Sequence, residues 1–471
     1  MNSSLFLSRR RLFGVAGLLA ASGLAAACGA SGTGSSAGSS ASSARASEAD
    51  DPTAIATDAY VFGYPLVLMD ATRAAAAPAN TLLRYTTTPS PDDKIVVTPN
   101  VDTLYCQTWL DLSHEPQVIQ IPDVKDRYWL AQVMDMWTNT VHDPSSVSPQ
   151  LAAGAPAGPF TYAVTGPRWS GDLPAGVTRL SVPTDSAWII VRVALNGAND
   201  VPAVVDIENQ IRLMPLSRYR TDPTAQTPSS VPQNLTAAPA RIVAGMDGTA
   251  FFTKLAALLT RYPATQADGA AMTRFASIGI KPGANVAALT ASVLDAGATA
   301  GKRAIAAYQN PGAKNLNGWV YATNLGTYDT DYQLRANTAL TTLAANLPGD
   351  SLYPMLNDVP AKPNGYRLHF PAGLLPPAGA FWSITAYTAD HFLVPNPDRI
   401  YAIGHSPDPV ANPDGSVDLT LAPNKPGPQV PEGNWLPVPG NGTFNLAMRI
   451  YAPKPAAVSG GWKPPALTPI G

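Results

Sequence analysis

Residues 94–134 read KIVVTPNVDTLYCQTWLDLSHEPQVIQIPDVKDRYWLAQVM, and this stretch decides the fold. It consists of short apolar runs separated by turns rich in Pro, Asp and Asn, with runs at 94–97, 104–110, 117–121 and 128–134. Runs of this length bounded by such turn residues are typical of strands in all-β domains. The pattern continues at 161–164 and 188–193 and returns from 366 to 451. We therefore expect two β domains, each a sandwich or jelly roll.

Apolar residues at helical spacing predict helices before and between these β regions. The expected helices cover 53–73, 201–213 with Asp200 as its cap, 248–261, 268–277, 285–308 and 329–346. The predicted fold class is α+β, mostly β, with two β-sandwich or jelly-roll-like domains joined by a helical segment. The predicted segments are an N-terminal helix plus β domain (51–217), a helical connector (218–346) and a C-terminal β-sandwich domain (347–471).

The first 28 residues have the form of a signal sequence. Ser8-Arg9-Arg10-Arg11 precedes an apolar run over 12–27 that is shorter than the roughly 20 residues of a membrane span. Adjacent arginines after a serine are typical of twin-arginine export. We therefore expect an extracytoplasmic protein.

Small residues stand directly before Cys28, as in lipoprotein signals, where this cysteine is acylated. Residues 29–50 follow as a tether rich in Ser, Gly and Ala, which cannot bury apolar area. The expected location is the cell membrane, with the lipid as the only membrane contact. The alternative is cleavage after Ala27, which leaves a free cysteine and a secreted protein. If Cys28 carries lipid, Cys106 is the one remaining cysteine and no intramolecular disulfide forms.

The charge balance argues against nucleic acid as a partner. Removing the three arginines of residues 1–28 leaves 28 Lys and Arg against 33 Asp and Glu, a net charge of −5. No basic cluster follows the signal sequence, whereas nucleic-acid-binding proteins normally carry a basic stripe. The sequence leaves the oligomeric state open, including a homo-oligomer.

Common cofactor and metal motifs are not found. The chain has no phosphate loop, dinucleotide fingerprint or zinc-binding His-Glu-x-x-His helix, so we expect no cofactor. The five histidines are scattered, with no pair at metal-ligand spacing, so we expect no histidine-rich metal centre. An oxygen-ligand calcium site stays open.

Two clusters in the first β region combine polar side chains with strand ends. In the first, Asn100, Asp102 and Tyr105 surround a turn that enters a strand, from which they can reach a pocket. In the second, Asp135 and Asn139 end a strand run. The alternative for both clusters is that Asn and Asp bond the backbone of their own turns.

A third cluster covers residues 326–335. Asp329 or Thr330 is the expected cap of the following helix, and Asp331 and Arg335 are spaced as an i,i+4 ion pair. A surface pair of this kind contributes only about 0.3–0.5 kcal/mol. Buried beside Tyr328 and Tyr332, the same pair could instead hold a polar ligand.

Four tryptophans can serve as stacking platforms for sugar rings, namely Trp319, Trp382, Trp435 and Trp462. The alternative is packing in the core or at the edge of a β sandwich.

Certain short stretches resemble a known pair of domains. In the first half they are Ala59-Tyr60 to Tyr64-Pro65, Pro99-Asn100-Val101-Asp102-Thr103-Leu104, Asp135 with Thr138-Asn139, and Leu213-Met214-Pro215-Leu216. In the second half they are Gly318-Trp319, Gly326-Thr327-Tyr328, Asp331-Tyr332 with Arg335-Ala336, Pro376-Pro377 to Phe381-Trp382-Ser383, Asp414-Gly415-Ser416, Asn434-Trp435-Leu436-Pro437 and Arg449-Ile450-Tyr451. On these residues, 53–215 resemble the domain of unknown function twelve-fifty-four, and 318–465 resemble its usual partner, twelve-fourteen. The resemblance implies β-sandwich or jelly-roll-like domains joined by helices, often in exported proteins, and no established reaction.

Three functions remain open. The first is an exported, lipid-anchored cell-envelope protein that binds a small molecule or glycan, with Asn100, Tyr105, Asn139, Tyr328, Tyr332, Arg335, Trp382 and Trp435 as candidate contacts. The second is a hydrolase or lyase that uses Asp102, Asp135 and Asp331 as acid and base groups in an inter-domain cleft, where neighbouring carboxylates can have separated pKa values. The third is an assembly protein of the envelope. We rank binding first and catalysis second.

Overall fold

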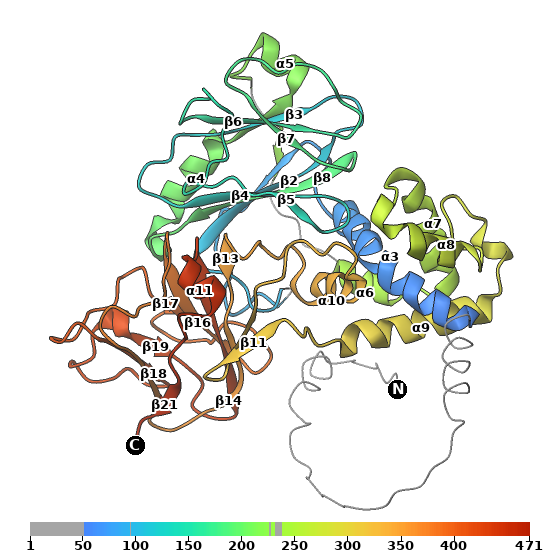
Figure 1. Ribbon diagram of the computed structural model, residues 1–471. Helices are drawn as coiled ribbons and strands as arrows, with labels where there is room; N and C mark the ends of the chain where they lie inside the picture. The colour runs from blue at the N-terminus through green and yellow to red at the C-terminus, as the bar shows by residue number, and fades with distance from the viewer. Residues whose placement is uncertain (1–50, 95, 226–227, 231–237) are drawn as a thin grey trace, which may run out of the picture. The chain divides into compact units, whose positions relative to one another are not determined.

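The computed structural model describes residues 51–94, 96–225, 228–230 and 238–471 (Figure 1). These residues form an α+β structure with two compact units. The helical unit takes its described residues from 51–68, 239–309 and 329–341, and the β unit from 69–238, 310–328 and 342–471. Residues 1–50, which contain the expected signal sequence, Cys28 and the tether, lie outside the described residues.

The helical unit is built on close contact between two helices. Helix α3 (Pro52–Ala74) contributes its residues up to Leu68, and α9 (Ala291–Ala307) packs against them. A Cβ atom at Gly297 would lie 2.4 Å from the Cβ of Ala56, and one at Gly301 would lie 2.6 Å from Cδ1 of Tyr60. Glycine is therefore needed at both positions for the helices to approach this closely.

This packing explains why the unit boundaries differ from the predicted segments. The sequence placed the first helix with the N-terminal β domain, but its residues up to Leu68 group with the helices of the predicted connector. The Tyr60 ring stacks on Phe251 of α7 (Gly248–Arg261), with ring centroids 4.0 Å apart. Contacts between residues distant in sequence therefore determine to which unit the first helix belongs.

The helices predicted for the residues of this unit are confirmed, with some shifted ends. Helix α7 begins and ends where predicted, and its cap is Asp247, whose Oδ1 accepts a hydrogen bond from the Ala250 N–H at 2.7 Å. The other predicted helices of this unit differ from their predicted ranges by a few residues at one or both ends. The remaining helices of this unit are α6 (Pro239–Ala244), α8 (Gly269–Ala276) and α10 (Tyr332–Thr342).

The first half of the β unit, which we call the N-module, is a sandwich of two sheets. The six-stranded sheet has the order β10-β1-β2-β8-β4-β5 and the four-stranded sheet the order β7-β6-β3-β9. Leu104 and Val191 from one sheet pack in a common core with Ile119 and Tyr162 from the other. The strands are β1 (Leu82–Arg84), β2 (Thr103–Asp111), β3 (Gln117–Ile121), β4 (Trp129–Met134), β5 (Thr140–His142), β6 (Phe160–Thr165), β7 (Thr178–Ser181), β8 (Ser186–Ala194), β9 (Arg212–Pro215) and β10 (Ser229–Ser230).

The second half of the β unit, the C-module, is also a sandwich. Its seven-stranded sheet follows the order β11-β12-β14-β20-β16-β17, with β13 also paired to β20, and its four-stranded sheet follows β19-β18-β15-β21. Ile384 and Leu446 pack against Leu368 and Leu419 in the core between the sheets. The elements are β11 (Ala313–Leu316), β12 (Trp319–Ala322), β13 (Ser351–Leu352), β14 (Met355–Pro360), β15 (Tyr366–Phe370), β16 (Trp382–Thr388), β17 (Ala402–Ile403), β18 (Val417–Ala422), β19 (Trp435–Pro437), β20 (Thr443–Tyr451), α11 (Pro455–Ser459) and β21 (Leu467–Pro469).

Two local predictions were wrong. Residues 96–98 form a bend instead of a strand, because Val96 is 63% exposed and Thr98 takes a positive φ of 52° just before Pro99. The helix predicted from 201 to 213 ends earlier, as α4 (Val201–Gln210), because residues 212–215 pair with β3 as strand β9.

Asp200 is not the side-chain cap of α4. Its carboxylate instead pairs with the Arg127 guanidinium and accepts the Asn196 N–H at 2.8 Å. The sequence signal that marks the start of this helix is Pro202 in its first turn.

Cys106 is a buried free thiol in the N-module. No helix among the described residues is long and apolar enough to cross a membrane.

Candidate functional site

The turn that enters β2 joins the two modules of the β unit. Asp102 is 2% exposed, and its Oδ2 accepts hydrogen bonds from Ser383 Oγ at 2.6 Å and Tyr451 Oη at 3.0 Å. Asn100 Nδ2 donates to the hydroxyls of Tyr105 and Tyr451, both at 3.0 Å. Asn100, Asp102 and Tyr105 therefore do come together, and their partners belong to the C-module.

The same turn also satisfies its own backbone. Asn100 Oδ1 accepts the Asp102 N–H at 2.7 Å, which is the alternative role considered for this residue. The Asn100 side chain thus has both roles at once. It fixes the turn and reaches across to β20.

Arg449 extends this network on the C-module side. Its guanidinium donates to Thr385 Oγ1 at 2.8 Å, to Tyr387 Oη at 2.7 Å and to the Thr98 carbonyl at 3.1 Å. Burial alone would lower the pKa of Arg449, but Tyr387 and Asp102 raise it, so the side chain stays charged. A buried network of satisfied charge and hydroxyl groups rigidifies a unique arrangement. We therefore assign this network a role in holding the modules together.

Asp135 and Asn139 close a turn between β4 and β5. Asp135 Oδ1 accepts the backbone N–H groups of Trp137 and Asn139, both at 2.9 Å, and its Oδ2 accepts the Asn139 side-chain amide at 2.9 Å. Asp135 is 3% exposed. The structure thus shows the local turn role for both side chains.

The third predicted cluster is divided between the two units. Tyr328 belongs to the β unit, where its hydroxyl accepts the Gly326 N–H at 3.2 Å. Asp331, Tyr332 and Arg335 belong to the helical unit. Asp331 caps α10, in place of the predicted Asp329 or Thr330, because its Oδ1 accepts the Leu334 N–H at 3.0 Å.

Tyr332 and Arg335 are packed within the helical unit. The Tyr332 hydroxyl donates to Asp268 Oδ1 at 2.9 Å, and burial followed by the nearby Asp268 raises the pKa of Tyr332 to about 12. The Arg335 guanidinium lies over the rings of Phe62 and Tyr332, 5.4 and 5.3 Å from their centroids. Arg335 is 4% exposed, so its contacts lie in the interior of this unit.

Trp382 and Trp435 lie in the C-module core. Trp382 is 7% exposed and packs on Phe370 at a centroid distance of 5.4 Å. Trp435 is 3% exposed, and its indole N–H donates to the Ala422 carbonyl at 3.1 Å. Both side chains have the packing role that was the alternative to sugar stacking.

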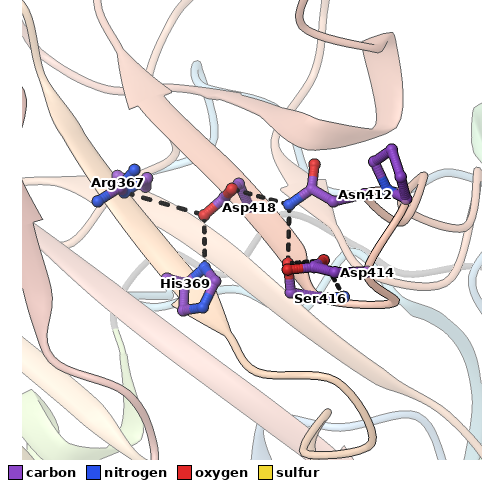
Figure 2. A pocket seen from close by; sticks show the side chains of 7 residues that line it. Arg367, His369, Asn412, Asp414, Ser416 and Asp418 are labelled. Atoms are coloured by element: carbon purple, nitrogen blue, oxygen red, sulfur yellow. Dashed lines mark hydrogen bonds and ion pairs between the residues drawn. The ribbon is translucent and has the colours of Figure 1, made fainter.

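An open pocket of about 510 Å³ lies on the outer face of the four-stranded sheet of the C-module (Figure 2). Arg367 and His369 stand two residues apart on β15 and so point to the same face, with Asp418 opposite His369 on β18. The turn that precedes β18 adds Asn412 and Ser416 to the lining. Figure 2 shows these side chains gathered around the Asp418 carboxylate.

The hydrogen bonds of the pocket fix the orientation of the histidine ring. His369 Nδ1 lies 2.8 Å from Asp418 Oδ1, and Asn412 Nδ2 donates to Asp418 Oδ2 at 2.9 Å. Because an ionised carboxylate can only accept, Nδ1 carries a proton and donates it to Asp418, so that Nε2 is an acceptor in the neutral ring. Burial opposes ionisation of Asp418, but the bonds from His369 and Asn412 outweigh it and lower its pKa.

The pocket contains charges of both signs. Asp414 Oδ1 accepts the Ser416 hydroxyl at 2.6 Å, and this bond lowers the pKa of Asp414. Arg367 Nε lies 3.8 Å from Asp418 Oδ1. The site therefore offers donors and acceptors with no large excess of either charge. Among the described residues, no group of three or more His, Cys, Asp or Glu is arranged to hold a metal ion.

Two family models match the chain, each on one of the sandwich modules. The model described as "Protein of unknown function (DUF1254)" matches residues 79–215, and "Protein of unknown function (DUF1214)" matches residues 357–455. The chain belongs to the proteins that pair these two domains. The resemblance seen in the sequence is thereby confirmed, and the pocket of Figure 2 lies in the DUF1214 domain.

A solved structure from Vibrio parahaemolyticus shows the same fold. The crystal structure of the VPA0106 protein from Vibrio parahaemolyticus is 21% identical with a TM-score of 0.66, over 89% of this chain and 100% of that chain. An uncharacterized protein from Burkholderia cenocepacia is 14% identical with a TM-score of 0.43, over 91% of this chain and 96% of that chain. No curated protein matches the chain.

The sequence prediction missed the pocket residues Arg367, His369, Asn412 and Asp418. A usable signal was present, because the alternation in Tyr366–Phe370 places Arg367 and His369 on the exposed face of β15. The strand that pairs with β15 was not identifiable from local sequence, so the approach of Asp418 to His369 could not be foreseen.

Proposed function

We propose that this DUF1254–DUF1214 protein is an exported, lipid-anchored cell-envelope protein that binds a small molecule or glycan in the pocket of Figure 2. The observation that carries the proposal is the fixed arrangement of Arg367, His369 and Asn412 around Asp418 in an open pocket. Pockets of a few hundred Å³ with a few convergent polar groups are the usual form of small-molecule sites.

The chemistry of the lining favours a neutral ligand with hydroxyl groups. A hydroxyl both donates and accepts, so it can pair with His369 Nε2 as acceptor and with the Arg367 guanidinium as donor. Asp414 and Asp418 offset the positive charge of Arg367, which disfavours an anion. A sugar is the ligand class that fits these donors and acceptors best.

Binding is tested by titration calorimetry of the full chain with a panel of neutral sugars and short glycans. His369→Ala and Arg367→Ala should each weaken binding about tenfold, the usual loss for one or two hydrogen bonds. Arg303→Ala, which removes an exposed arginine from α9, is the matched control and should leave binding unchanged. Binding that survives both pocket substitutions would remove this pocket from the proposal.

Export and lipid attachment rest on residues 1–50. Metabolic labelling of cells with a fatty-acid probe should label the full chain and leave Cys28→Ser unlabelled. Label on the Cys28→Ser chain, or no label on either, would contradict the anchor.

A second candidate function is the hydrolase or lyase, on a different pair of acids from those named above. Asp102 and Asp135 are occupied by hydrogen bonds, whereas Asp350, 9% exposed, interacts electrostatically with the half-buried Asp143. Burial, and then Asp143, raises the pKa of Asp350 to about 9, so this carboxyl holds a proton at neutral pH. A carboxyl that keeps its proton at neutral pH is suited to act as a general acid.

This alternative predicts turnover of some glycoside or ester substrate by the full chain. Asp350→Asn and Asp143→Asn should each abolish it, while Asp206→Asn, an exposed acid on α4, should not. Turnover that persists in both variants would exclude the pair.

A further inference from the structure

Arg192 is a buried arginine of the N-module that has no acidic partner among the described residues. It lies on β8, is 6% exposed, and forms no ion pair within this part of the chain. Burial lowers the pKa of Arg192, but the nearby Tyr105 and Tyr353 raise it further, so the side chain stays charged. Buried charges in proteins are normally paired, because an unpaired one strongly destabilises the fold. Arg192 therefore lacks an anion that the described chain does not supply.

One side of the Arg192 guanidinium is held by the protein and the other side is open. Its Nη1 donates to Gln132 Oε1 at 2.9 Å, and the Gln132 amide donates in turn to Thr140 Oγ1 at 2.8 Å and to the Ala345 carbonyl at 2.9 Å. Nε and Nη2 make no hydrogen bond to the described residues, yet neither atom is fully shielded from solvent. Their N–H groups are parallel and form the fork that a carboxylate accepts with both oxygens.

Two tyrosine hydroxyls beside Arg192 can donate to the same ligand. The Cζ atom of Arg192 lies 5.6 Å from the centroid of the Tyr105 ring. Tyr105 Oη accepts the Asn100 amide at 3.0 Å and Tyr353 Oη accepts the Asn346 amide at 2.6 Å, and neither hydroxyl donates to any of the described residues. Both tyrosines are partly exposed. The surroundings of Arg192 thus offer N–H and O–H donors that solvent can reach.

The acids near Arg192 do not neutralise it at neutral pH. Asp350 interacts electrostatically with Arg192, but burial and then Asp143 raise the pKa of Asp350 to about 9, so this carboxyl is neutral. Neither Asp350 nor Asp143 forms an ion pair with Arg192. Asp102 interacts with Arg449 and balances the charge of that side chain. One positive charge therefore stays uncompensated, which suits a monoanion better than a dianion such as phosphate.

From this arrangement we infer that the β unit binds a small molecule with a carboxylate group at Arg192. The carboxylate accepts hydrogen bonds from Nε and Nη2 of Arg192 and from the hydroxyls of Tyr105 and Tyr353. This site shares no residue with the pocket of Figure 2 and does not depend on the ligand proposed there. It lies near Asp350, but binding of the carboxylate requires no turnover and so does not depend on the second candidate function either.

The melting temperature of the full chain with matched acids and amides tests the charge preference. Acetate, butyrate and benzoate present the carboxylate on three frameworks, and acetamide, butyramide and benzamide present similar shapes without the charge, all at constant ionic strength. A carboxylate at about 100 mM, a hundredfold excess over a millimolar Kd, should raise the Tm by about 3–5 °C. The matching amide, and inorganic phosphate, should need at least about tenfold more for the same shift.

Equal shifts for a carboxylate and its amide would overturn the inference, because the uncompensated charge would then have no effect on binding. A larger shift with phosphate than with every carboxylate, or no shift with any of the three carboxylates, would also overturn it.

A pair of matched variants tests the assignment to Arg192. Arg192→Met removes the guanidinium at similar volume and should weaken carboxylate binding about tenfold or more, so that acid and amide act alike. Arg399→Met removes an exposed arginine from the same unit and should leave the preference unchanged. If both variants respond to the carboxylate equally, Arg192 does not hold the anion and the inference is wrong.

A second substitution serves if Arg192→Met fails to fold. Arg192→Lys keeps the positive charge but lacks the two parallel N–H groups, so it should weaken carboxylate binding about tenfold and leave the amide unaffected. An unchanged carboxylate affinity in Arg192→Lys would overturn the inference as well.

Discussion

Replacing Glu208 by glutamine should stabilise the protein at neutral pH and have little effect in mild acid. Glu208 lies on α4 with 1% of its surface exposed, and neither carboxylate oxygen has a hydrogen-bond partner in the described structure. The nearby Arg84 guanidinium donates instead to the backbone carbonyls of Glu208 and Ile211, at 3.0 and 2.9 Å. Burial, only partly offset by the charge of Arg84, raises the pKa of Glu208 to about 8.

The magnitude follows from the difference between the folded and unfolded pKa values. The unfolded chain ionises this group near its ordinary pKa of 4.5, whereas the folded chain keeps it neutral up to about 8. Below pH 4.5 the carboxyl is neutral in both the folded and the unfolded chain, so it does not change the free energy of unfolding. As pH rises from there to about 8, the group ionises only in the unfolded chain, which lowers the free energy of unfolding. At pH 7 the loss is up to about 3 kcal/mol, since each pH unit of this window corresponds to ~1.4 kcal/mol. Glutamine cannot ionise, so the variant should regain this free energy.

The assay is urea unfolding of both proteins across a series of pH values, followed by tryptophan fluorescence. The difference in unfolding free energy should rise from near zero in mild acid to a plateau above pH 8. Asp206→Asn is the control, because Asp206 lies on the same helix but is exposed. A gain of equal size at every pH, or a loss at neutral pH, would show that Glu208 is not a buried neutral acid.

Three further changes test the packing of each unit. Asp102→Ala removes a carboxylate that balances the buried Arg449 and should lower the free energy of unfolding by about 3 kcal/mol or more, measured by urea unfolding; a loss below about 1 kcal/mol would contradict the buried network. Gly301→Ala places a methyl group against Tyr60 and should cost about 1–3 kcal/mol, visible as an earlier loss of helical circular dichroism on heating; an unchanged transition would mean that α3 and α9 are not in close contact. Asp247→Ala removes the cap of α7 and should cost about 1 kcal/mol in the same experiment, whereas Asp247→Asn should keep most of the stability.

Local sequence pattern was sufficient for the elements of the fold. Strands β2, β3, β4, β6 and β8 and helix α7 lie close to their predicted positions because alternation and capping act over a few residues, whereas the short strands β5 and β7 were not predicted. The strand expected at 94–97 failed because an apolar run can also form an exposed bend before a proline. The pattern of apolar residues along a segment does not show which other part of the chain will pack against that segment.

The candidate site depended on contacts that no local pattern contains. Asn100 and Asp102 were selected as pocket residues, yet their partners Ser383 and Tyr451 lie hundreds of positions away.

The hydrogen bonds of Asp102 also constrain the order of folding. Asp102 is separated by 281 positions from Ser383 and by 349 from Tyr451, so its partners are made long after it during synthesis. Until β16 and β20 exist, the turn at residues 98–102 has no C-module to bond, and the edge of the N-module stays hydrated. Contacts of such sequence separation slow folding, because the chain must close a large loop before it gains them. The β unit can therefore reach its final state only after nearly the whole polypeptide has been synthesised, and a chain cut short of Tyr451 would present an unpaired acid to any proteolytic quality control it meets.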